Sequence, residues 1–244
     1  MIEVSAPAKL TVSLRVTGVR DDGYHLIDAE MVSLDFADRL VIDPDGSGVE
    51  VTGADGGGMV PADADNLVAR ALDLCGRTAG VRIEKHIPPG AGLGGGSADA
   101  AAILRWAGFD DPEAAAAIGA DVAFCLRGGR ARVTGIGEQV EPLEPVAASF
   151  TLLTPLLHCS TPTVYAKWDE LGRPRGDHGN DLEPAAVAAY PELARFRDEL
   201  GDHTGVRPRL AGSGSTWFVE GAFEGPGLRV VSTTGPAVDR PNAT

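Results

Sequence analysis

The sequence predicts an α+β protein in which strands and helices follow one another without a regular period. Residues 11–17 alternate strictly between polar and apolar side chains, as a half-buried strand does. Later in the chain Leu67, Ala71 and Leu72 fall on one face of a helical pattern. Because no repeating strand–helix–strand unit connects such segments, we expect a mixed architecture rather than a doubly wound parallel sheet.

Length and composition indicate a chain that buries a real core in one large domain or two small ones. The chain has 244 residues, of which 43% are hydrophobic and 5% aromatic, so small side chains must do much of the packing. Pro142 and Pro145 interrupt the chain just before a new apolar strand. We therefore predict an N-terminal domain over residues 1–147 and a C-terminal domain over residues 148–244.

The first part of the chain is expected to form strands and helices in turn. The strand over 11–17 ends at a turn, because glycine and aspartate gather at Gly18 and in the segment 21–23. An aspartate before an apolar helical pattern caps a helix by accepting its free N–H groups. The elements that follow are, in order, strands over 26–36 and 39–42, an exposed loop or hairpin tip over 45–58, a helix from Asp63 or Asp65 to about Ala79, a strand over 81–87, helices over 97–106 and 113–118, and a hairpin of 130–134 with 139–143.

The second part begins with the apolar strand over 150–157. A helical region follows over 182–200, with Pro184 and Pro191 near turn starts or kinks. Strands are then expected over 207–211, 216–220 and 228–231, and the end over 235–244 is expected to be loose.

The charge of the chain limits its partners. Twenty-one basic against 35 acidic residues give a formal net charge of −14, and no basic cluster stands out. Such a chain is repelled by nucleic acid and by anionic membranes, so a small molecule is the expected partner. Three widely spaced cysteines, no signal peptide and no long apolar run indicate a cytoplasmic protein with reduced thiols.

A glycine-rich segment over residues 88–98 is the most informative part of the sequence. Five glycines fall within residues 90–96, between an apolar run and an alanine-rich run. Glycine lets backbone N–H groups approach a ligand closely, and a helix that begins near Ser97 would add its free N–H groups and dipole. The segment therefore predicts a phosphate site, formed by Pro88, Pro89, Gly90, Ala91, Gly92, Leu93, Gly94, Gly95, Gly96, Ser97 and Ala98.

Three other interpretations compete for this segment. Gly90, Gly92 and Gly95 match the dinucleotide fingerprint, but two prolines separate them from the preceding strand. The P-loop of the nucleotide triphosphatases needs a lysine after its glycines, and none is present here. A tight turn capped by Ser97, without any ligand, is the structural alternative.

The glycine-rich segment resembles the phosphate loop of the GHMP kinase superfamily, and within it the family of 4-diphosphocytidyl-2-C-methyl-D-erythritol kinases. Other segments resemble motifs of that family in the same order, from residue 7 to about residue 218. They are Pro7-Ala8-Lys9-Leu10, Asp22-Gly23-Tyr24-His25, Asp65-Asn66-Leu67, Gly119-Ala120-Asp121-Val122, Gly137-Glu138, Asn180-Asp181-Leu182-Glu183 and 211–216.

The resemblance implies a fold of two α/β subdomains with the active site in the cleft between them, and an ATP- and Mg²⁺-dependent transfer of phosphate to a sugar alcohol. It makes Asp121 the general base with Lys9 beside it, a pairing in which the ammonium keeps the carboxylate ionised. It places Asn66 and Lys85 near the nucleotide and gives Ser97 a contact with phosphate or Mg²⁺. From spacing alone, Asp121 would suit a turn or cap and Lys9 a solvated strand position.

The resemblance also implies an acceptor that carries cytidine, phosphorylated at its 2-hydroxyl in the non-mevalonate route to isoprenoids. Tyr24, His25 and Tyr165 match residues around the base, where rings can stack and imidazole can bond a pyrimidine edge. Thr11 stands where the family has asparagine and is also assigned to the acceptor. Met31 and Ala123 replace an aromatic residue and a proline, and these departures concern the acceptor more than the reaction.

Two other functions remain open at this point. The chain can be a GHMP kinase that acts on another small alcohol, or a nucleotide-binding protein without turnover. A dehydrogenase is the most distant alternative.

Overall fold

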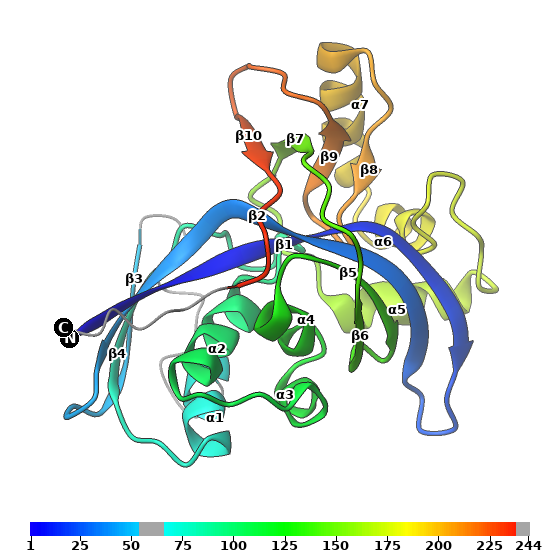
Figure 1. Cartoon of the computed structure of the whole chain (residues 1–244). Coiled ribbons are helices and arrows are strands. Elements are labelled where there is room, and N and C mark those ends of the chain that lie inside the picture. Colours follow the sequence, from blue (N-terminus) through cyan, green and yellow to red (C-terminus); the bar gives the residue numbers. More distant parts are fainter. Residues whose placement is uncertain (54–65, 238–244) are drawn as a thin grey trace.

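A computed structural model describes residues 1–53 and 66–237, whose strands form two sheets with helices against both (Figure 1). The two longest strands are β1 (Ile2–Val19) and β2 (His25–Asp43), which pair antiparallel and cross the whole molecule. The separate strands predicted over 26–36 and 39–42 are therefore one strand. Irregularities in the pairing at Pro7/Lys9, Thr11/Ser13 and Val16/Gly18 let this ribbon bend without a break.

The first sheet has the order β3-β4-β2-β5-β6, with β1 beside β2. β3 (Gly48–Thr52) runs parallel to β4 (Gly80–Glu84), so the loop or hairpin tip predicted over 45–58 is wrong for residues 48–52, while 54–58 lie outside the described residues. β5 (Arg130–Gly135) and β6 (Gln139–Pro142) form the predicted hairpin.

Four helices gather against one side of the first sheet (Figure 1). They are α1 (Leu67–Leu74), α2 (Gly95–Trp106), α3 (Pro112–Ile118) and α4 (Val122–Arg127). Asp63 and Asp65, the predicted caps, lie outside the described residues; Asn66 caps α1 by accepting from the Val68 N–H at 2.8 Å. The helix ends well before Ala79 because a left-handed Gly76 follows it. α4 was not predicted.

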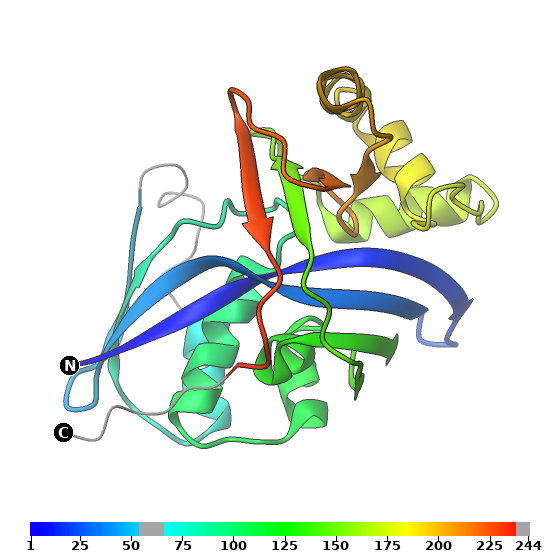
Figure 2. The same ribbon diagram turned by 45° about the horizontal axis from the view of Figure 1, so that its top comes forward.

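The second sheet has the order β10-β7-β9-β8, and its strands β7 and β10 cross over the β1–β2 ribbon (Figure 2). Its strands are β7 (Ser149–Leu153), β8 (Arg209–Leu210), β9 (Trp217–Glu220) and β10 (Leu228–Ser232). Three helices accompany it: the unpredicted α5 (Thr161–Glu170), then α6 (Glu183–Ala189) and α7 (Leu193–Thr204). The single helical region predicted over 182–200 is divided before Pro191, which cannot continue the hydrogen-bonding of α6.

After β10 the chain returns to the first sheet. The Thr234 N–H donates to the Ser33 carbonyl at 2.9 Å, and the Ala237 N–H donates to the Arg127 carbonyl at 3.2 Å. Residues 235–237 are therefore held in place, contrary to the prediction of a loose end; 238–244 lie outside the described residues.

Two apolar clusters stabilise the fold. The larger one lies between the first sheet and its helices and extends to α5–α7, with Ile83, Ile103 and Trp217 among its fully buried members. The smaller one lies where the second sheet packs on the ribbon, around Leu10, Leu34 and Phe218. Within residues 1–53 and 66–237, no helix combines the length and apolar character needed to cross a membrane.

Candidate active site

The glycine-rich segment connects β4 to α2 and lines a cavity of about 1080 Å³. Gly90, Gly92 and Gly94 have φ values of +71°, +77° and +69°, a region that L side chains rarely adopt. A Cβ on Gly92 would lie 2.4 Å from the Ala211 carbonyl oxygen. The close packing of this segment against its neighbours thus requires glycine.

The helix behind the loop begins earlier than predicted. α2 starts at Gly95, its N-cap is Gly94, and no side chain caps it. Ser97 is therefore the third residue of the helix, and the alternative in which it caps the turn is wrong. Its partly exposed side chain instead lines the cavity.

Lys9 and Asp121 meet beside this loop. Lys9 Nζ lies 3.2 Å from Asp121 Oδ2 and 3.1 Å from the Thr11 hydroxyl, to which it donates. The Lys9 N–H donates to the Leu93 carbonyl at 2.9 Å, and a Cβ on Gly94 would lie 2.8 Å from Lys9 Cγ. The lysine is therefore buried directly against the glycine-rich segment.

The position of Asp121 explains why its carboxylate is available. It is the N-cap residue of α4, yet its side chain makes no capping hydrogen bond. The carboxylate faces Lys9 in the cavity, with 32% of its side chain exposed. A partly exposed carboxylate held by a buried ammonium can accept a proton from a hydroxyl that enters the cavity.

Lys85 lines the same cavity, but its charge is already matched. Its Nζ donates to Asp38 and, at 2.7 Å, to Oδ2 of Asp99. Asp38 Oδ1 also accepts from the N–H groups of His86 and Ile87, at 2.5 and 2.8 Å. Burial raises the pKa of Asp99 to about 7, since Lys85 only partly offsets the cost of removing that carboxylate from water.

At the far end of the β1–β2 ribbon, three rings line the cavity. Tyr24, in the turn before β2, is 60% exposed, whereas Tyr165 of α5 is partly buried, and this desolvation raises the pKa of its hydroxyl. The ring centroids of His25 and Tyr165 are 4.5 Å apart. His25 Nε2 lies 2.9 Å from Asp169 Oδ2.

Most of the predicted site residues thus line one cavity. They are Lys9, Thr11, Tyr24, His25, Asn66, Lys85, Pro88, Pro89, Gly90, Ala91, Gly92, Gly94, Gly95, Gly96, Ser97, Asp121 and Tyr165. Leu93 and Ala98 do not line it: both are 1% exposed and pack into the interior. They support the loop through packing and, for Leu93, through its carbonyl bond to Lys9.

Sequence reasoning missed several residues of this cavity. Asp99 and Asp169 carry carboxylates next to predicted residues, and Gly212 and Ser213 of the β8–β9 turn complete the wall beside Lys9. Asn180 fixes that turn by donating to the Gly212 carbonyl at 2.7 Å. The spacing between Tyr165 and Asp169, one helical turn, was the only available signal for Asp169.

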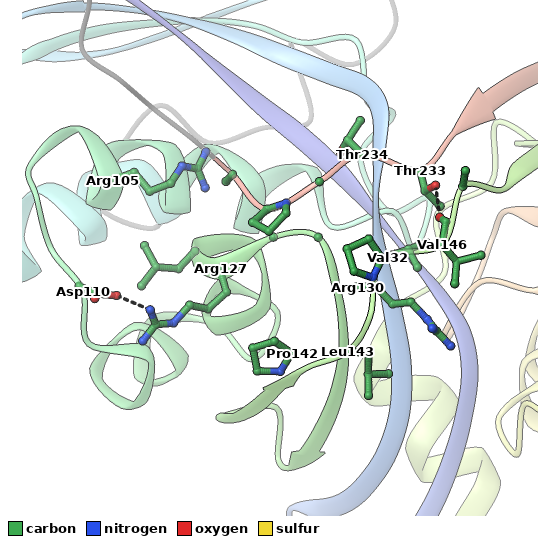
Figure 3. Close-up of a pocket in the computed structure, with 18 of the residues that line it drawn as sticks. Val32, Arg105, Asp110, Arg127, Arg130, Pro142, Leu143, Val146, Thr233 and Thr234 are labelled. Carbon is green, nitrogen blue, oxygen red and sulfur yellow. Dashed lines mark hydrogen bonds and ion pairs between the residues drawn. The ribbon is translucent and has the colours of Figure 1, made fainter.

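A second cavity, of about 740 Å³, contains none of the predicted site residues (Figure 3). It lies between the ends of α2 and α4 and the segment 233–237. Its arginines do not converge on the space: Arg127 pairs with Asp110 at 3.0 Å, Arg130 pairs with Glu30 at 2.7 Å, and Arg105 donates to the Cys125 carbonyl. The cavity along the β1–β2 ribbon is therefore the candidate active site.

Comparisons with known proteins agree with this choice. The profile of the GHMP kinases N terminal domain matches residues 66–129, which include the glycine-rich segment and Asp121. A 4-diphosphocytidyl-2-C-methyl-D-erythritol kinase of Dinoroseobacter shibae is 40% identical over 91% of this chain and 85% of its own length. The enzyme of the same name from Cereibacter sphaeroides is 39% identical over 89% of this chain and 88% of its own length.

A solved structure is also similar along the whole chain. The crystal structure of a 4-(cytidine 5'-diphospho)-2C-methyl-D-erythritol kinase has a TM-score of 0.73 and 32% identity, and covers 96% of this chain and 100% of its own. These matches confirm the predicted fold, two α/β subdomains of the GHMP kinase type. The chain belongs to the GHMP kinase superfamily, in its family of 4-diphosphocytidyl-2-C-methyl-D-erythritol kinases.

Proposed function

We propose that this kinase transfers the γ-phosphoryl group of ATP to the 2-hydroxyl of 4-diphosphocytidyl-2-C-methyl-D-erythritol, a step of non-mevalonate isoprenoid precursor synthesis. One observation supports this most directly. The Lys9–Asp121 pair, at 3.2 Å, lies against the glycine-rich segment in the same cavity as the rings of Tyr24, His25 and Tyr165.

The glycine-rich segment is proposed to hold the phosphates of ATP. Its glycines allow the left-handed turns and the close packing that bring this backbone to the cavity, and the N-terminus of the 12-residue α2 adds uncapped N–H groups. Because Lys85 is already paired with Asp38 and Asp99, we assign charge neutralisation to these N–H groups and to Lys9. Asn66 and Lys85 are proposed to lie beside the nucleotide, in the cavity that they line.

Asp121 is proposed to accept the proton of the attacking hydroxyl as that oxygen bonds to the γ-phosphorus. Lys9 then stabilises the carboxylate before transfer and the equatorial phosphate oxygens during it, because its ammonium is buried and fixed by Thr11. Positioning and charge stabilisation supply most of the rate in such reactions.

Mg²⁺ is expected to accompany the nucleotide. No group of three or more metal-ligating side chains occurs among residues 1–53 and 66–237, so the phosphates would supply most of its ligands. The residues present fit that arrangement, since the Ser97 hydroxyl lines the cavity in the first turn of α2. When bound, the ion neutralises charge on the transferring phosphate.

The acceptor is proposed to bind with its base between Tyr24 and Tyr165 and its edge against His25. An aromatic clamp suits a pyrimidine because both faces of the base are apolar. Residues of both predicted domains line the cavity, which supports the proposal that the site lies between units 1–147 and 148–244. We place the enzyme in the cytoplasm, where three free thiols remain reduced.

Incubation of the purified protein with ATP, Mg²⁺ and the cytidine substrate tests the proposal. Mass analysis should find an acceptor with one added phosphate. A panel of other small alcohols separates the alternatives: transfer to one of them and not to the cytidine substrate would favour a different GHMP kinase activity. Binding of ATP without transfer to any acceptor would favour a protein without turnover.

A further inference from the structure

The ring of His25 is held by one face of α5. Tyr165 packs on the ring with its plane tilted by 32°, and Trp168 meets it edge-on at 5.6 Å. Oδ2 of Asp169, one helical turn after Tyr165, lies 2.9 Å from His25 Nε2. Only 12% of the His25 side chain is exposed. Three residues of one helix therefore hold its ring in place.

We propose that Asp169 is a positioning residue for base recognition, and that by fixing the orientation and tautomer of His25 it favours cytosine over uracil. This inference rests on the proposed function of the cavity. Nothing in the motifs of the sequence marks Asp169, which lies beyond the segment that suggested Tyr165.

The hydrogen bond itself fixes the tautomer. An ionised carboxylate only accepts, so His25 Nε2 must carry the proton of this bond. A neutral imidazole then has its lone pair on Nδ1, the ring nitrogen left for a ligand in the cavity. Arg173 holds Asp169 from the other side, with Nε 2.9 Å from Oδ1, so the carboxylate cannot easily turn away.

A fixed acceptor at Nδ1 discriminates between the two pyrimidines. Cytosine has an exocyclic amine at its fourth position, which donates to Nδ1. Uracil has a carbonyl oxygen there, so two acceptors would face each other without a proton between them. A buried polar group left without a partner costs much more than a hydrogen bond gains, which makes the contact selective.

Competitive inhibition by CDP and by UDP, measured against the cytidine substrate at a pH near 8, tests this assignment. The wild-type enzyme is expected to bind CDP at least about tenfold more tightly than UDP. Asp169→Ala releases the ring, and Asp169→Asn offers Nε2 either a donor or an acceptor. Both variants should lose most of the preference and raise the KM for the cytidine substrate, while the KM for ATP stays near the wild-type value.

Glu170→Gln is the matched control, because Glu170 is the next residue of α5 and pairs with Lys167, away from His25. It should keep the preference for CDP. An active Asp169→Ala enzyme with the wild-type ratio of CDP to UDP affinity would overturn the assignment, as would a wild-type enzyme without any preference. Failure of the wild-type protein to phosphorylate the cytidine substrate would instead contradict the proposed function.

Discussion

Replacement of Asp121 by asparagine separates the proposed chemistry from binding. The amide has nearly the same shape and can still accept from Lys9 Nζ, but it cannot take a proton from the substrate hydroxyl. We expect Asp121→Asn to fold, to bind ATP with little change in KM, and to lose most of its turnover.

The structure sets the size of the effect. Opposite unit charges 3.2 Å apart attract by about 5 kcal/mol at an effective dielectric constant of about 20. The 32% exposure of the Asp121 side chain lets water screen part of this attraction. Positioned general bases contribute about 10²–10⁴ in rate, which is roughly 3–5.5 kcal/mol of activation free energy.

Steady-state release of ADP, measured with saturating cytidine substrate, gives kcat and the KM for ATP. Asp110→Asn is the control, because this exposed aspartate pairs with Arg127 at the second cavity. A kcat for Asp121→Asn within a few-fold of the wild-type value, in a protein with an unchanged unfolding midpoint, would refute the role of Asp121 as the base.

Three further predictions concern the loop, the buried carboxylate and the exposed ring. Gly92→Ala should destabilise the fold by at least about 1–2 kcal/mol through its positive φ alone, and the clash with the Ala211 carbonyl adds to this cost. Gly96→Ala, inside α2, should instead stabilise the fold by roughly 0.5–1 kcal/mol. Equal unfolding free energies of the two variants would contradict this prediction. The folded state keeps the Asp99 proton up to about pH 7 while the unfolded chain releases it near pH 4, so this group lowers stability as pH rises through that window. Between about pH 5 and about pH 8, the unfolding free energy of Asp99→Asn should therefore fall less than that of the wild type, as measured by urea titration. An identical fall in both proteins would argue against a raised pKa of Asp99. Tyr24→Ala should raise the KM for the cytidine substrate and leave thermal unfolding unchanged, because the residue is 60% exposed; a larger effect on the KM for ATP would contradict its assignment to the base.

The local pattern predicted the existence of many elements but not their extent. β1 was expected only over 11–17. Residues 8–10 are buried on both faces and break the alternation, which separated the alternating stretch 2–6 from the rest of the strand. α4 spans six residues, which is too short for a helical period to appear. α5 has only two buried residues, Val164 and Trp168, so it lacks the apolar stripe that marks a helix.

The site was predicted by resemblance where spacing alone favoured ordinary structural roles. Lys9 and Asp121 are far apart in the chain, and their contact depends on how α4 packs against the ribbon. The match of Lys85 with Asp38 and Asp99 also depends on three separate elements, β2, the end of β4 and α2. Such long-range pairs leave no periodic pattern, so charge matching inside the cavity could only be seen in three dimensions.

In the proposed binding mode, the continuous ribbon of β1 and β2 carries residues for both ends of the acceptor. Lys9 pairs with Ser33 near its middle, and His25 pairs with Val19 at its end, so both of the proposed contacts with the acceptor belong to one pair of strands. The interval between the reacting hydroxyl and the base is thus set by strand residues and not by a mobile joint. A molecule with the same base but a different distance between base and hydroxyl would then occupy the cavity without reacting.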